Sequence, residues 1–138
     1  MNCHQKKLSI TTRGKDFHRI TRTVEEAVAE SGIKTGLCTI FVLHTSASLV
    51  IQENADPDVL IDLSNFFTQL VPESGRYVHS TEGPDDMPAH IRSALTKTSE
   101  QIPISQGRLM LGIWQGVYLW EHRSGSHKRD IIIHISGV

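Results

Sequence analysis

The chain has 138 residues, a common size for a single domain with one hydrophobic core. Its 14 basic and 15 acidic residues nearly cancel, so there is no general positive field to hold nucleic acid. No signal peptide and no apolar run of the ~20 residues that span a bilayer occur, and two cysteines are too few for a disulfide framework. We therefore expect one cytoplasmic domain over residues 1–138, without nucleic-acid or membrane partners.

The first predicted elements are a strand and a helix. Residues 5–12 alternate loosely between polar and apolar types, which is typical of a strand with one solvent-facing side. Thr23 and Glu26 have the spacing of a capping box, and apolar residues recur at helical spacing until Gly32. This pattern predicts a helix that ends at Gly32.

Two buried strands and a second helix follow. The runs 37–43 and 49–51 are apolar and β-branched, and they flank a polar segment that we place at a strand end or bend. Asp56 before Pro57 matches an N-cap followed by proline in the first turn of a helix. An apolar stripe then predicts a helix that ends near Pro72.

The remaining chain is predicted to be a long loop, a short helix and several strands. Residues 73–87 are rich in Gly, Pro, Ser and acidic residues, which is typical of a functional connection. A helix is expected over 88–97, and strands over 102–105, 109–114, 117–121 and 128–136. The sequence thus predicts an α+β fold, a β-rich domain with antiparallel or mixed pairing and about three helices.

Two polar clusters lie between the second strand and the second helix. His44, Thr45 and Ser46 offer an imidazole and hydroxyls to a phosphate or a metal ion, or their hydroxyls bond the backbone of a turn. Asn54 and Asp56 lead into a helix whose free N–H groups favour an anion, although Asp56 also fits a plain N-cap. Both clusters are candidates for ligand binding.

Two further clusters carry titratable groups. His79, Glu82, Asp85, Asp86 and His90 combine imidazoles with carboxylates, and the spacing of Asp86 and His90 places them on one helix face. This cluster suits a divalent ion, or it is a set of exposed loop charges. Towards the C-terminus lie Gln115 and Glu121, and Glu121 is a candidate general base or metal ligand. Arg123 and Arg129 can bind a phosphate, or one of them forms a cross-strand ion pair with Glu121.

Taken together, several motifs resemble one family in order along nearly the whole chain, the secondary thiamine-phosphate synthase family. The motifs are H-T-S-A-S from His44, E-N-x-D-P from Glu53, Y-x-H from Tyr77, D-M-P-A-H-I from Asp86, G-R-L from Gly107, W-Q-G from Trp114 and E-H-R from Glu121. The resemblance implies a cytoplasmic α+β homotrimer with a small phosphorylated substrate and a divalent metal ion, zinc or magnesium.

The resemblance also suggests roles for individual residues. His44, His79 and His90 are expected to bind the metal ion, and the catalytic residues are expected to be Glu121, Asp86 and Gln115. The expected phosphate or ligand contacts are Asn54 and Arg129, together with four residues of the polar clusters themselves: Thr45, Ser46, Asp56 and Arg123.

Three functions are compatible with these residues. The leading hypothesis is a thiamine-phosphate synthase-like transferase that joins a pyrimidine diphosphate to a thiazole phosphate and releases pyrophosphate. A metal-dependent hydrolase of a phosphorylated metabolite would use the same ligands to activate water. A non-catalytic trimer that binds a small molecule would use the clusters for affinity alone.

Overall fold

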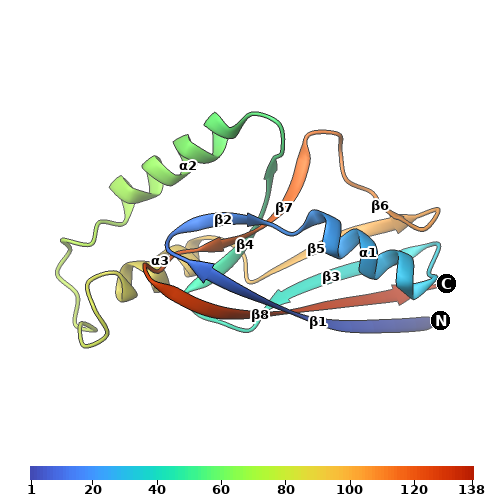
Figure 1. The fold of residues 1–138 in the computed structure, drawn as a ribbon, viewed down its shortest axis with the longest axis horizontal. Coiled ribbons are helices and arrows are strands. Elements are labelled where there is room, and N and C mark those ends of the chain that lie inside the picture. Colours follow the sequence, from blue (N-terminus) through green and yellow to red (C-terminus); the bar gives the residue numbers. More distant parts are fainter.

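A computed structural model describes residues 1–138 as three helices and eight strands, which confirms the predicted α+β class (Figure 1). The helices are α1 (Thr21–Ser31), α2 (Pro57–Leu70) and α3 (Asp86–Leu95). The strands are β1 (Asn2–Arg13), β2 (Asp16–Arg19), β3 (Gly36–Val42), β4 (Ala47–Glu53), β5 (Ser99–Ser105), β6 (Arg108–Leu109), β7 (Gln115–Glu121) and β8 (Ser126–Gly137).

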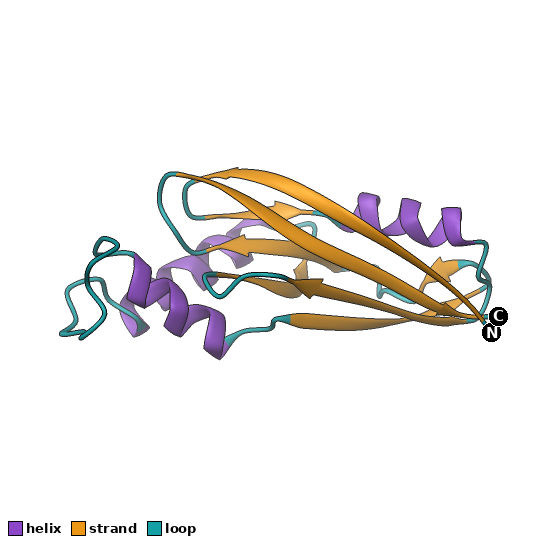
Figure 2. Ribbon diagram, turned by 90° about the horizontal axis from the view of Figure 1, so that it is seen from below, coloured by secondary structure: helices purple, strands orange, loops and turns teal.

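The strands form two antiparallel sheets. The larger has the order β1-β8-β3-β5-β6, and the smaller has the order β2-β7-β4. Strands β1 and β8 pair along their full length, from Asn2 with Gly137 to Arg13 with Ser126. This pairing brings the two termini together at one end of the molecule, while α3 and the connection before it lie at the opposite end (Figures 1 and 2).

One hydrophobic core lies between the sheets and α1. Alternate residues of β8 point into it, and Ile131, Ile133 and Ile135 are fully buried there because strand side chains alternate between faces. Leu119 from the smaller sheet and Val24 from α1 belong to the same cluster. Burial of each such side chain contributes ~1.5–3 kcal/mol, so this core fixes the ends of the strands that carry the polar clusters.

Helix α2 begins as predicted but packs differently from a core helix. The Asp56 side chain accepts a hydrogen bond from the backbone N–H of Asp58, and Pro57 occupies the first turn. No residue of α2 is fully buried, although its apolar stripe is present. None of the three helices combines the length and hydrophobicity that crossing a membrane requires.

Several local predictions were wrong. Strand β2 was missed, because its four residues, Asp-Phe-His-Arg, are too short and polar to show a pattern. The strand expected over 109–114 is confined to the two residues of β6, since 110–114 form a loop. Helix α1 has Ile20 rather than a side-chain cap at its start, and α3 begins at Asp86 rather than at residue 88.

Candidate metal site

Four side chains converge at the start of α3. Their candidate ligand atoms all lie within 4.8 Å of one another, and they belong to His79, Glu82, Asp86 and His90. Asp86 Oδ2 lies 2.6 Å from His79 Nε2 and 3.2 Å from His90 Nε2, and His79 Nε2 lies 3.2 Å from Glu82 Oε2. The connection before α3 supplies His79 and Glu82, and the helix places Asp86 and His90 one turn apart.

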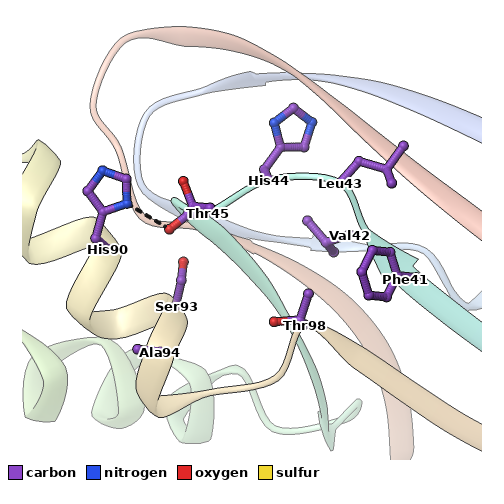
Figure 3. A pocket seen from close by; sticks show the side chains of 9 residues that line it. All are labelled: Phe41, Val42, Leu43, His44, Thr45, His90, Ser93, Ala94 and Thr98. Atoms are coloured by element: carbon purple, nitrogen blue, oxygen red, sulfur yellow. Dashed lines mark hydrogen bonds between the residues drawn. The ribbon is translucent and has the colours of Figure 1, made fainter.

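The orientation of His90 is fixed by the backbone of a distant segment. His90 Nδ1 donates a hydrogen bond of 3.0 Å to the carbonyl oxygen of Thr45 (Figure 3). Because a carbonyl oxygen only accepts, Nδ1 of His90 carries a proton, so Nε2 meets Asp86 Oδ2 either as the lone pair of the neutral ring, which a metal ion can bind, or as a second donor of the imidazolium. In either state a positive charge lies between the two atoms, supplied by the ring proton or by a bound metal ion.

Asp86 itself is held by a buried ionic network. Its side chain is 4% exposed, and Arg123 Nε lies 3.4 Å from its second oxygen, Oδ1. Burial alone would raise the pKa of this carboxyl, but the hydrogen bonds with His79 and Glu82 and the charges of His90 and Arg123 together lower it. The hydrogen bond with Asp86 raises the pKa of His79. Asp86 is therefore an ionised carboxylate with one oxygen aimed at two imidazoles.

Arg123 is positioned by the neighbouring acid, Asp85. The Asp85 carboxylate accepts hydrogen bonds from Arg123 Nε at 3.2 Å and from the backbone N–H of Ser124 at 2.9 Å. Burial opposes ionisation of Asp85, yet these bonds lower its pKa to about 2. Arg123 was expected to bind phosphate, and here its guanidinium is already paired with two carboxylates.

Glu121 and Arg129 form a separate buried pair. Arg129 Nε donates to Glu121 Oε1 at 2.7 Å, and its Nη2 donates to Oε2 at 2.5 Å. Thr12 Oγ1 and the backbone N–H of Arg123 also donate to the same carboxylate. Glu121 is 0% exposed and Arg129 is 4% exposed, so the structure brings the predicted base and the predicted phosphate ligand to each other rather than to the metal cluster.

The polar segment after β3 contributes through its backbone. His44 lies outside the converging group, because its Nε2 accepts a hydrogen bond of 2.8 Å from the backbone N–H of Asp130. Burial and the nearby Arg129 lower the pKa of His44. Thr45 orients His90 by its carbonyl oxygen, and the carbonyl oxygen of Ser46 accepts from Arg129 at 3.3 Å.

The remaining predicted residues lie at the far end of β7. Gln115 begins this strand and Glu121 ends it, and six residue steps separate them by roughly 20 Å. Gln115 Oε1 accepts from the backbone N–H of Gly112, and Asn54 Nδ2 donates to the carbonyl oxygen of Ile113. Asp56 caps α2. The structure does not bring these three residues to the histidines.

The predicted ligand set omitted Glu82 and Asp85. Both belong to the cluster that the sequence singled out, and the three-residue spacing of His79 and Glu82 was the available signal for the first. Asp85 acts through Arg123, a residue that follows it by 38 positions, so no local pattern could indicate its role.

The fold and this site define a small α+β protein of two antiparallel sheets with a histidine–carboxylate cluster at the start of one helix. The chain belongs to the YjbQ/UPF0047 family, because the family model described as UPF0047 protein YjbQ-like matches residues 6–138. UPF0047 protein sll1880 of Synechocystis sp. is 67% identical over 97% of this chain and 92% of its own. UPF0047 protein YjbQ of Escherichia coli O157:H7 is 40% identical over 97% and 98%.

Solved structures of relatives share the fold. A YjbQ/UPF0047 protein of Clostridium acetobutylicum, an orthologue of YugU from Bacillus subtilis, has a TM-score of 0.89 at 38% identity and covers 95% of this chain and 99% of its own. A protein of Sulfolobus solfataricus has a TM-score of 0.88 at 26% identity and covers 99% and 100%.

These comparisons correct the family and the function expected from the motifs. The matching family is YjbQ/UPF0047 and not a thiamine-phosphate synthase family, and none of the relatives above is described as such an enzyme. The predicted link to thiamine biosynthesis and the predicted transferase reaction were therefore wrong. The motifs identified a real group of relatives, but the activity attached to that group does not follow from them.

Proposed function

We propose that this protein is a metal-dependent hydrolase that binds one divalent ion through His79, Asp86 and His90. The observation that carries the proposal is the convergence of four candidate ligand atoms within 4.8 Å, with His90 anchored through Nδ1 so that Nε2 is turned towards Asp86 Oδ2 at 3.2 Å. A metal ion bound here would take the place of the ring protons between the imidazoles and the carboxylate. A hydrogen bond from the second ring nitrogen to a carbonyl oxygen is the usual support of a metal-bound histidine.

The donor set favours zinc over magnesium. Imidazole nitrogens suit zinc and the related transition metals, whereas magnesium prefers oxygen ligands and retains water. Two histidines and one carboxylate are also the ligand set of catalytic zinc sites that keep a position for water. Asp86, with its side chain 4% exposed, supplies the shielded negative charge that the ion needs.

The surrounding residues fit the activation of water. A bound ion of this class lowers the pKa of a water ligand towards neutrality and so supplies hydroxide. Glu82 lies 3.2 Å from His79 Nε2 with its side chain 61% exposed, so it is placed to be a fourth ligand or to accept the proton of that water. Arg123 holds Asp86 from the opposite side, which keeps Oδ2 directed at the histidines.

Zinc titration of the metal-free protein by calorimetry tests the proposal. Wild type should bind one zinc ion per chain more tightly than magnesium, and His90→Ala should weaken zinc affinity by about tenfold or more. His134→Ala is the matched control, because His134 contacts Gln5 on β1 and lies outside the cluster. His44→Ala should also retain zinc. No zinc binding, or equal losses in His90→Ala and His134→Ala, would refute the site.

A further inference from the structure

A pocket of about 530 Å³ adjoins the proposed metal site on its His90 side (Figure 3). The end of β3 and residues 43–45 form one side of it, and α3 with Thr98 forms the other. Its volume is in the range of sites that enclose small organic molecules. Because His90 belongs both to this pocket and to the cluster with Asp86, a molecule in the pocket lies next to the metal position.

The pocket is lined without any formal charge. Phe41, Val42, Leu43 and Ala94 supply its apolar surface, and hydroxyls and imidazoles supply the rest. No aspartate, glutamate, lysine or arginine lines it, so a charged group placed away from His90 and the metal position would lose hydration without a partner. A second hollow, on the His79 side of the cluster, differs in that the acidic Glu73 lines it. The His90 side therefore suits the neutral part of a ligand.

Two hydrogen-bond donors of this lining have no acceptor of their own. Ser93 Oγ is buried and has no hydrogen-bond partner. His44 Nε2 accepts from the backbone of Asp130, so the proton of the neutral ring sits on Nδ1, which makes no hydrogen bond within the protein. An unmade hydrogen bond of a buried donor such as Ser93 Oγ costs ~1–3 kcal/mol, whereas His44 is half-buried and its Nδ1 would exchange a water for a ligand oxygen.

Resting on the metal site proposed above, we propose that this pocket binds the body of a neutral ester or lactone. The carbonyl oxygen accepts a hydrogen bond from Ser93 Oγ or His44 Nδ1, and the carbonyl carbon lies towards His90. Hydrolysis forms a bond from the oxygen of water to this carbon and breaks its bond to the alkoxy oxygen. The products are the carboxylic acid and the alcohol, which takes the proton released by water.

Nuclear magnetic resonance tests the pocket without turnover. Methyl benzoate should shift the backbone amide signals of Thr45, Ser93 and Ala94, and phenyl phosphate, which is charged, should leave them in place. Ala94→Trp fills the pocket and should abolish the shifts. Leu95→Trp is the control, because Leu95 is 56% exposed on the same helix and does not line the pocket. Equal shifts with phenyl phosphate, or equal losses in both variants, would overturn the assignment.

Turnover with one equivalent of zinc separates the two proposals. Release of 4-nitrophenol from 4-nitrophenyl acetate should exceed release from 4-nitrophenyl phosphate. Ala94→Trp should lower kcat/KM for 4-nitrophenyl acetate about tenfold or more and leave zinc affinity unchanged. Bound zinc without any methyl benzoate shift would overturn the pocket alone. Normal methyl benzoate shifts without zinc binding would overturn the metal site and leave the ligand class of the pocket in place.

Discussion

Glu121 and Asp86 are both buried carboxylates, but they have different partners. Asp86 faces two imidazoles, which are metal ligands, whereas Glu121 faces one guanidinium and two further donors that satisfy both of its oxygens. A carboxylate with every lone-pair direction occupied stabilises the fold in place of binding a ligand. Glu121, which the sequence indicated as a base, thus has the surroundings of a structural ion pair with Arg129.

We predict that Glu121→Gln destabilises the protein by about 3 kcal/mol, because Arg129 is left buried without its counter-charge. Glu26→Gln, which removes an exposed ion pair with Arg22, should cost about 0.5 kcal/mol or less. Urea unfolding of the three proteins measures both changes. Similar losses in the two variants would show that the Glu121 pair contributes no more than a surface pair.

His122 is a buried neutral base whose titration is coupled to folding. It is 1% exposed, and its Nε2 lies 2.8 Å from Ser48 Oγ. Burial, reinforced by the charge of Arg92, lowers the pKa of His122 to about 3. The unfolded chain therefore takes up a proton near pH 6.5 that the folded chain does not, so acidification between pH 6.5 and about 3 favours unfolding.

We predict that, between pH 7 and pH 5, the unfolding free energy of wild type falls by about 2 kcal/mol more than that of His122→Asn. The interval from the unfolded pKa of about 6.5 to pH 5 is about 1.5 pH units, and each unit contributes about 1.36 kcal/mol. His44 and His79 titrate in both proteins, so their contributions cancel in this comparison. Urea unfolding at the two pH values gives the difference. Parallel pH profiles would mean that His122 is protonated in the folded state.

At the scale of elements, the cluster at the start of α3 could be predicted because its four members lie within twelve consecutive residues. Asp86 and His90 are one helical turn apart, and that relation is local. The supporting contact from Thr45 to His90 joins segments 45 positions apart through a backbone carbonyl, which no residue type encodes.

The polar segment after β3 shows the same limit. It was predicted as a bend that presents hydroxyls, yet Ala47 and Ser48 already belong to β4. Ser48 is fully buried and contacts His122, which directly follows β7, the strand that pairs with β4. Alternation along a strand decides which hydroxyl faces inwards, and a one-residue change in where the strand begins reverses the prediction.

At the scale of the whole molecule, α2 and the end of β3 are among the segments that leave apolar surface uncovered. Helix α2 has no fully buried residue, and its Ile61, Phe66 and Leu70 are more than half exposed. Phe41 and Leu43, at the end of β3 beside the pocket, are 44% and 48% exposed. Apolar surface of this extent is typical of an interface with another chain.

The homotrimer expected from the sequence stays a prediction, and this surface supplies a way to test it. Light scattering should give a mass three times the 15.4 kDa of one chain. Phe66→Glu should dissociate the assembly, because a carboxylate placed in an apolar interface loses its hydration without a partner. Gln69→Glu adds the same charge at an exposed polar position of α2 and should leave the mass unchanged. Two results would exclude α2 as the contact and leave its apolar side facing solvent. One is a wild-type mass equal to that of one chain, and the other is a trimer that Phe66→Glu does not weaken.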